Sequence, residues 1–579
     1  MKKLIAIVAI LMPMMAVAQS LNVNVDSVGT LEKQLPDSIR FKVAELKVTG
    51  PLNGADLKLL SQIVTRTKTN RKVADECLVK SIDLSEATIE EGKDGMKTDK
   101  NALPASLFSG AKSLVRVYLP EGTVSIGRNC FDNCPELTEV PIPETVVTIG
   151  ANAFSDCVNL SAVVLPAGLT TIEHDAFEGC TSMTAIEIPG QVTELGANAF
   201  KGCFSLSKVV IIGPVKNIAS AVFMDCESLS EVTVPESVKS IGNNAFRGCK
   251  MLEEIHLPDD LDEIGSSAFE KCRNLASIGI SKVGKIGSNA FQECSNLQSL
   301  EIEGVKSMGN AAFQKCLSLK SVSLKGNLSE IGMDTFSDCG SLTSVALPDN
   351  VKKIESRVFL NCRSLSELDL PAALNRMNDR VFESCSSLKC IVIPKSTRSM
   401  GKSVFENCTL LDSVRIEGFI DEIATDAFRK CHSLRSIAIP VSVKKIGTKA
   451  FEDCNSLAEV KLPVTLLSIG SDAFARCVAL QSIVIPAAVK EIGGSAFSEC
   501  SALASVELPV GLKSVGGSAF AKCVSLREVM VNSPMPPKIS KSTFSDVVLA
   551  ACKFYVPRGS LSLYKQDKQW QKLSQLLEK

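Results

Sequence analysis

Residues 146–166 read VVTIGANAFSDCVNLSAVVLP, and the same pattern recurs along most of the chain. Aligned on Phe154, a Phe returns every 23 residues, and twice after 22, from Phe108 to Phe520, which makes 19 units. Phe544 marks a degenerate twentieth unit, so 20 of the 24 Phe share one position. With 579 residues the chain is too long for one ordinary hydrophobic core, and this fixed period indicates a repeat array.

Within one unit the apolar residues are spaced unevenly, as expected of a coil that turns corners. Val163 and Leu165 flank an outward Val164, which is the pattern of a short strand with one buried face. Gly150 permits a backbone turn, and Asn152 to Cys157 is interpreted as a short helical turn. The sequence therefore predicts a leucine-rich-repeat solenoid of the α/β superhelix type. We expect a long curved parallel β-sheet with one short strand per 22–23-residue coil and short helical turns on the opposite side.

The ends of such a stack need caps, because one coil alone does not bury enough apolar surface to offset the entropy of ordering it. Residues 19–100 are expected to form an N-terminal capping region with irregular repeat-like units, including an amphipathic helix from Asp56 to Val64. Nineteen regular repeats follow over residues 101–533. Residues 534–579 are expected to hold the degenerate last repeat and a C-terminal cap, with Trp570 in its last helix.

The first 18 residues have the features of a signal peptide. Lys2 and Lys3 precede the apolar run from Leu4 to Met12, and Ala16-Val17-Ala18 is the small-x-small pattern that signal peptidase accepts. A membrane anchor is the other interpretation, but the apolar stretch is short for a span. We therefore expect export through the general secretory route to the cell surface or the medium, or to the periplasm. No later segment has 18 uninterrupted apolar residues, which predicts a mature chain without a membrane span.

The unit I-G-x-x-A-F-x-x-C-x-x-L-x-x-h-x-h-P, where h is an apolar residue, resembles the BspA-like class of leucine-rich repeats, common in exported bacterial proteins. The closing sequence from Phe554 to Trp570 also looks like the terminal unit of that class. The resemblance covers about residues 101–579 and is much weaker before them. It implies adhesion and the binding of host or partner-cell proteins.

Cysteine follows the same register. Eighteen of the 22 Cys, from Cys134 to Cys523, lie three residues after the repeat Phe. Residues stacked at one position lie about 4.8 Å apart with parallel Cα–Cβ bonds, which is unsuited to a disulfide. We expect a ladder of buried free thiols and no zinc, because paired C-x-x-C spacing is absent. Cys77, Cys130, Cys390 and Cys552 lie outside the ladder. Cys130 replaces the repeat Ala and is expected in the core.

Composition argues against catalysis and against nucleic acid as a partner. Lys and Arg total 63 against 64 Asp and Glu, so the chain has no excess of positive charge that would attract the phosphate backbone of a nucleic acid. At about 4.8 Å per coil, His174 and His432 lie on the order of 50 Å apart, and His256 lies between them. Because these groups do not converge, we expect no enzyme, no cofactor and no metal site.

The outward strand position varies along the chain while the inward positions are nearly constant, so the fold does not dictate its residues. This outward column comprises Tyr118, Pro141, Val164, Glu187, Val210, Thr233, His256, Gly279, Glu301, Ser323, Ala346, Asp369, Val392, Arg415, Ala438, Lys461, Val484, Glu507 and Met530. It is either a solvated face or a recognition surface on the concave sheet, and our candidate binding face is Val392, Arg415, Lys461, Val484 and Glu507.

Two functions remain open. The first is recognition of another protein, host or cell-surface, through that face, as in an adhesin or a receptor. The alternative is glycan binding or an architectural spacer. Glycan sites usually offer aromatic platforms, and only Tyr118 supplies one in the outward column, so glycan ranks lower.

Overall fold

The computed structural model describes residues 19–65 and 79–579, so the predicted signal peptide and Cys77 lie outside the described residues. The chain forms a parallel-strand β-solenoid of about 24 coils, with about 23 residues per turn and little helix. It divides into two compact units, the first ending at Val215 and the second running from Lys216 to Lys579. The predicted solenoid of the leucine-rich-repeat type is confirmed.

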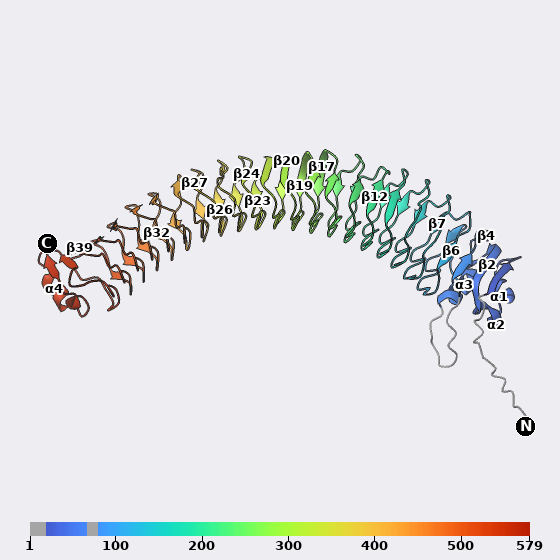
Figure 1. Cartoon of the computed structure of the whole chain (residues 1–579), viewed down its shortest axis with the longest axis horizontal. Coiled ribbons are helices and arrows are strands. Elements are labelled where there is room, and N and C mark those ends of the chain that lie inside the picture. The colour runs from blue at the N-terminus through green and yellow to red at the C-terminus, as the bar shows by residue number, and fades with distance from the viewer. Residues whose placement is uncertain (1–18, 66–78) are drawn as a thin grey trace, which may run out of the picture. The chain divides into compact units, whose positions relative to one another are not determined.

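A first row of parallel strands follows the stacked coils of each unit (Figure 1), and most of the predicted outward column lies on these strands. In the first unit this row comprises β3 (Ser81–Asp83), β6 (Arg116–Tyr118), β10 (Ala185–Ile188) and β12 (Lys208–Ile211). In the second unit it comprises β14 (Glu231–Thr233), β16 (Glu254–His256), β18 (Ser277–Gly279), β20 (Ser299–Val305), β22 (Ser321–Gly326), β24 (Ser344–Ala346), β27 (Cys390–Ile393), β29 (Ser413–Ile416), β31 (Ser436–Ala438), β33 (Glu459–Lys461), β35 (Ser482–Val484), β37 (Ser505–Leu508) and β39 (Glu528–Val531). The strands pair in parallel and in the predicted register, as between Glu187 and Val210.

The sheet of this row is less continuous than predicted. In the second unit it is broken into short ladders, among them β27 with β29, β31 with β33, and β35 with β37 and β39. Residues 366–371 form no strand, although they occupy a rung of the row. The strand predicted around Val164 in the first unit is also absent, because residues 161–166 are assigned no regular secondary structure.

Most coils contribute a strand to a second row, so the prediction of one strand per coil is wrong. In the first unit the second strand row comprises β4 (Ala87–Ile89), β5 (Ala102–Leu103), β7 (Ser125–Ile126), β8 (Thr148–Ile149), β9 (Thr171–Ile172) and β11 (Glu194–Leu195). In the second unit it comprises β13 (Asn217–Ile218), β15 (Ser240–Ile241), β17 (Asp260–Ile264), β19 (Lys282–Ile286), β21 (Ser307–Met308), β23 (Glu330–Ile331), β25 (Lys353–Ile354), β26 (Arg376–Met377), β28 (Ser399–Met400), β30 (Glu422–Ile423), β32 (Lys445–Ile446), β34 (Ser468–Ile469), β36 (Glu491–Ile492) and β38 (Ser514–Val515).

The Gly that follows the second strand is needed for a close approach between coils. A Cβ added at Gly150 would lie 2.8 Å from the Arg128 nitrogen and 2.9 Å from the Ile126 carbonyl oxygen of the preceding coil. Both atoms belong to the backbone and cannot move aside. Gly150 therefore sets the spacing between coils at this corner, in addition to turning the chain.

The predicted helical turn is a series of β-turns instead. Asn152 and Asp156 both have a φ of 55°, in the left-handed region, which a helix excludes. The N–H groups of Asn152, Phe154 and Asp156 donate to carbonyl oxygens of the next coil, over 3.1, 2.8 and 2.7 Å. Because these donors point along the stack, they cannot form the i to i−4 bonds of a helix. Asn and Asp suit these positions, since their short polar side chains tolerate a positive φ.

The core consists of columns of identical residues. Phe131 and Phe154 are fully buried, and their rings stack with centroids 5.1 Å apart and planes 7° apart. The same geometry recurs in the second unit, for example between Phe451 and Phe474 at 5.1 Å and 5°. Columns of Cys and Leu run beside the Phe column and are buried as well. The predicted stacking of Phe, Cys and Leu is confirmed in each unit.

The N-terminal region joins the solenoid through one long strand. It contains β1 (Gln19–Asn24), α1 (Leu31–Gln34), α2 (Asp37–Arg40), β2 (Val43–Leu52) and α3 (Gly54–Thr65). The β2 strand pairs with β3 of the first row through Glu45–Lys47 and with β4 of the second row through Gly50–Leu52. The predicted helix is α3, and its buried Asp56 accepts hydrogen bonds from the backbone of Gly29, Leu31 and Asn53.

The C-terminal end is closed by β40 (Lys553–Val556), α4 (Leu561–Gln566), the 3-10 turn η1 (Trp570–Lys572) and β41 (Leu576–Glu578). Tyr564 and Trp570 are fully buried here. The Tyr564 hydroxyl donates to the Ser533 carbonyl oxygen over 2.7 Å, and the Trp570 indole Nε1 donates to that of Pro537 over 2.8 Å. Within residues 19–65 and 79–579, no helix combines the length and the apolar character needed to cross a membrane.

Candidate functional site

The five residues of the predicted binding face lie on neighbouring coils of the second unit. Val392 in β27 pairs with Arg415 in β29, and Val484 in β35 pairs with Glu507 in β37. Lys461 ends β33, whose strand lies next to β35. Val392 is 44% exposed and Val484 is 69% exposed, whereas Glu507 is half-buried. The structure therefore brings these residues into one outward column, with Ala438 between Arg415 and Lys461.

The positive charges of this face are partly neutralised by carboxylates two residues away in sequence. Arg415 lies 2.8 Å from a Glu417 carboxylate oxygen, and Lys461 lies 3.6 Å from Glu459. Both cations are more than 70% exposed, so water screens these pairs. Glu507 accepts a hydrogen bond from Asn532 over 2.6 Å. Arg415 and Lys461 thus remain accessible to a partner.

A shallow hollow of about 520 Å³ lies at one end of this face. It opens where residues 366–371 form no strand, next to β27. Its lining includes Asp369, Cys390, Val392, Lys395 and Glu417. The hollow mixes both signs of charge with an exposed thiol and an exposed valine, which suits contact with a protein surface more than an enclosed small-molecule site.

Two smaller hollows of about 380 Å³ each also lie on first-row strands. One is in the first unit, where Tyr118 lies beside Pro141, Ile142 and Pro143. The other is in the second unit and is lined by small and hydroxyl-bearing residues around Ser321 and Ser323. Tyr118 is half-buried, so only part of its ring is offered to a ligand.

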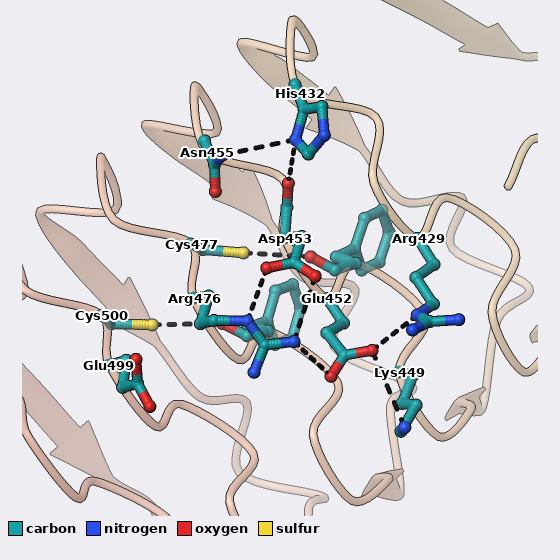
Figure 2. Close-up of polar contacts among 12 residues, drawn as sticks. Arg429, His432, Lys449, Glu452, Asp453, Asn455, Arg476, Cys477, Glu499 and Cys500 are labelled. Atoms are coloured by element: carbon teal, nitrogen blue, oxygen red, sulfur yellow. Dashed lines mark hydrogen bonds and ion pairs between the residues drawn. The ribbon is translucent and has the colours of Figure 1, made fainter. Parts of the chain in front are cut away.

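Sequence reasoning missed a network of ion pairs on the turn segments of the second unit. Figure 2 shows Glu452 between Arg429, Arg476 and Lys449. The Glu452 side chain is only 5% exposed, and its carboxylate oxygens lie 2.7 Å from Arg429 and 2.6 Å from Arg476. Arg476 also binds Asp453 over 2.5 Å. Arg429 and Glu452 directly follow the repeat Phe of their units, and Asp453 and Arg476 come one residue later. At both positions charges of opposite sign follow one another in successive units, and that alternation is the signal in the sequence.

The network shifts the ionisation of its members. The hydrogen bond from Arg476 lowers the pKa of Asp453, and the same bond raises the pKa of Arg476. Both pKa shifts favour the charged forms of Asp453 and Arg476. The network therefore consists of ion pairs that link neighbouring coils. A group with its charge held by a partner does not exchange protons near neutral pH, which argues against a role in acid–base chemistry.

The three histidines have separate surroundings. His174 is 53% exposed and contacts Asp175, its neighbour in sequence. His256 is exposed on β16. The Nδ1 atom of His432 lies 2.9 Å from the Asp453 carbonyl oxygen and 3.3 Å from Asn455 (Figure 2). In the described part of the chain, no group of three potential ligands is placed to hold a metal ion.

The cysteine ladder is buried in the predicted register. The described cysteines are free thiols, and those of the ladder donate to backbone carbonyl oxygens of the preceding coil. Cys130 is buried, as predicted, and so is Cys552. Cys390 is exposed, because it takes an outward position at the start of β27.

Comparison with protein families identifies four overlapping stretches, residues 101–230, 216–339, 306–435 and 421–549. Each matches the model described as a BspA type leucine rich repeat region of six copies. Together these stretches cover most of the chain. A comparison with curated proteins finds no significant match.

Solved structures with a similar chain path include several bacterial proteins. A leucine-rich repeat protein from Bacteroides ovatus is 23% identical, with 82% of this chain and 92% of that chain covered and a TM-score of 0.31. A leucine rich cell surface protein from Faecalibacterium prausnitzii is 28% identical over 62% of this chain and 86% of its own, with a TM-score of 0.33. The pneumococcal vaccine antigen PcpA is 16% identical over 72% and 93%, with a TM-score of 0.33.

Proposed function

Because the chain belongs to the BspA-type leucine-rich repeat family, we propose that it is a non-enzymatic exported protein that recognises another protein at the cell surface. Proteins of this family are generally binding proteins without catalytic activity, and they are typically exported or found on the cell surface. The proposed surface is the outward column of the first strand row, from Val392 to Glu507. The proposed partner is a host or cell-surface protein.

The contrast between inward and outward positions of the first row carries this proposal. Inward residues such as Ile391 and Ile483 are buried in the core, and their column is uniform. Outward residues in the same strands differ in charge and size, and Val392 and Val484 are exposed. Since solenoid stability is a sum over coils, outward residues can vary without disturbing the stack. They are therefore available for recognition.

The charge pattern also favours binding over chemistry. The raised pKa values belong mainly to core thiols, and the lowered ones to carboxylates in ion pairs. Burial and pairing explain these shifts without a reactive role. Large, mixed, partly apolar faces of this kind are typical of protein interfaces.

Whole-coil deletion tests the proposal. The mature chain is first immobilised and tested for binding of purified candidate host and cell-surface proteins. A partner that binds is then tested against two deletion variants, each of which lacks six coils. Removal of 383–520 takes out the whole of the proposed surface, whereas removal of 247–382 takes out an equal number of coils elsewhere. We expect only the first deletion to abolish binding. A partner that binds both deletion variants would refute the proposed binding surface. If both variants keep the protein's biological function, the protein is an architectural spacer.

A further inference from the structure

An exposed row of valines runs beside the proposed surface in the second unit. Val441, Val464 and Val510 occupy one position of the repeat, directly after the Pro that ends the first-row strand. They are 72%, 79% and 56% exposed. The intervening coil has Ala487 at this position, also exposed. The row spans three coil steps, about 15 Å at the spacing of parallel strands.

Lysines border these valines three residues further along each coil. Lys444, Leu467, Lys490 and Lys513 lie one above the next, because each backbone N–H donates to the preceding member's carbonyl oxygen over 2.8 to 3.0 Å. All four side chains are exposed. We call this surface, Val441, Val464, Val510, Lys444, Leu467, Lys490 and Lys513, the valine–lysine stripe.

The lysines of the stripe have no carboxylate partner among the described residues, which sets them apart from their neighbours. Lys445, one residue after Lys444, lies 3.7 Å from Glu422, and Lys461 lies 3.6 Å from Glu459. An exposed apolar row next to lysines without nearby carboxylates has the two features expected of a protein-binding surface. The valines offer apolar area that a partner can bury, and the lysines offer positive charge that acidic side chains of a partner can neutralise.

We propose that the valine–lysine stripe docks an acidic segment of a partner protein that also carries apolar side chains. The inference deepens the proposed function and rests on it, since it names the chemistry of the partner. The segment's carboxylates pair with Lys444, Lys490 and Lys513, and its apolar side chains cover the valines and Leu467.

The surroundings favour a narrow polypeptide over other anionic partners. Glycan and nucleic-acid backbones lack the apolar side chains that would cover Val441 and Val464. A planar anionic membrane would also approach the exposed carboxylates of Glu459 and Glu491, next to the stripe. A segment one strand wide can follow the stripe and avoid them. Lys461 and Val484 are exposed members of the outward column and lie three residues before Val464 and Ala487 in the same coils, so a longer partner can contact both surfaces.

A designed peptide tests the stripe on the full mature chain. The probe is a fluorescent 12-residue peptide of alternating Glu and Leu, with Gln/Leu and Lys/Leu peptides as charge controls, and binding is followed by anisotropy. We expect the Glu/Leu peptide to bind and the Lys/Leu peptide not to bind. Adding salt should weaken the interaction, because exposed charges contribute to it.

Charge reversal at Lys444, Lys490 and Lys513 (K444E/K490E/K513E) should weaken Glu/Leu binding by about tenfold or more and should create binding of the Lys/Leu peptide. The matched control is K239E/K306E/K352E, three exposed lysines at the same repeat position. There the residues at the valine position include Glu236 and Asp349. The control should leave binding unchanged. A second variant, V441S/V464S/V510S, should weaken binding about tenfold without lowering the melting temperature, since the three valines are exposed.

Three results would overturn the inference: no binding of the Glu/Leu peptide, equal binding by the charge-reversed chain, or preferential binding of the chain to phosphatidylglycerol–phosphatidylcholine vesicles. The coil deletions separate this failure from failure of the proposed function. If the peptide does not bind but removal of 383–520 still abolishes partner binding, only the stripe is wrong. If neither deletion affects partner binding, the proposed surface itself is wrong.

Discussion

The thiol of Cys157 donates a hydrogen bond over 3.1 Å to the carbonyl oxygen of Phe131, in the preceding coil. The same bond links Cys180 to Phe154 in the first unit and Cys454 to Phe428 in the second. A carbonyl group in the middle of the turn segment is thereby satisfied inside an apolar core, where an unpaired one would cost roughly 1–3 kcal/mol. The cysteine of each coil therefore packs in the core and also forms a hydrogen bond to the preceding coil.

Thiol labelling tests this role of the cysteines. In the native protein at pH 8, we expect a thiol reagent to modify exposed Cys390 and to leave the ladder cysteines unmodified, since they are fully buried. In denaturant without reductant, the ladder cysteines should all react, as mapped by mass spectrometry. A denatured thiol count near zero would instead establish disulfides.

Alkaline pH should destabilise the solenoid. Burial raises the pKa of Cys203 from 9.0 to about 12, so the folded state keeps a proton that the unfolded state releases above pH 9. The stability from this thiol is fully present below pH 9 and is lost as the pH rises toward 12, by up to about 1.4 kcal/mol per pH unit. Cys203→Ala should make the pH dependence of unfolding shallower than in the unsubstituted protein. Identical slopes in the two proteins would contradict this linkage.

Loss of one stacked ring should weaken the solenoid locally. Phe451→Ala removes a fully buried side chain and should cost about 3–5 kcal/mol. Because each coil contacts only its neighbours, hydrogen exchange should accelerate in the coils around residue 451 and remain slow in distant coils. Phe419→Ala, at a side chain that is 66% exposed, is the control and should leave exchange unchanged. Uniform acceleration along the chain would show that the coils unfold as one unit.

Glu452→Gln should disrupt the ion-pair network of Figure 2. The substitution removes the charge that Arg429 and Arg476 share, and we expect a loss of about 1–3 kcal/mol, less than for a fully buried pair because both arginines are partly exposed. Glu422→Gln, in an exposed pair with Lys445, should change stability by about 0.5 kcal/mol or less. Denaturant unfolding measures the loss of stability in both variants. Equal losses would show that burial of the Glu452 ion pairs adds nothing to the stability of the protein.

Joint substitution of Arg415 and Lys461 by Ala should weaken partner binding and leave the melting temperature unchanged, because both side chains are exposed. Lys445→Ala on the second strand row is the control and should preserve binding. Binding is measured by surface plasmon resonance with a captured partner, alongside thermal unfolding. A parallel loss of stability would count against a recognition role for these two residues.

The core and the first strand row could be predicted because their signals repeat in every unit. Phe154, Cys157 and Leu160 each recur at a fixed offset, and the register of Val164 and its counterparts follows from them. The turn segment could not be predicted from one unit, since the N–H groups of Asn152 and Asp156 donate to a different coil. Within a single unit those donors look free to form a helix. The recurrence of Asn, Asp and Gly two residues either side of the Phe was the available signal.

The candidate site was predicted only in part. The alternation of the strand places Val392 and Val484 outward, and no further information is needed for that assignment. The loop after each Pro leads into the second strand row, which the repeat pattern alone does not predict. The sequence therefore does not place Val441 and Lys444 together on one surface, although both recur in the units that follow.

The closing element at the C-terminus also limits how the molecule can associate. Each coil ends in backbone groups that the next coil satisfies, so a solenoid without its last element is an open template for another chain. Trp570 and Tyr564 fill that end and bind carbonyl oxygens of residues 533–537. A chain cut before Lys553 would expose the unpaired edge of the last coil and would be expected to self-associate through it. The closing residues thus allow a stack of any number of coils to end without an unpaired edge on this side.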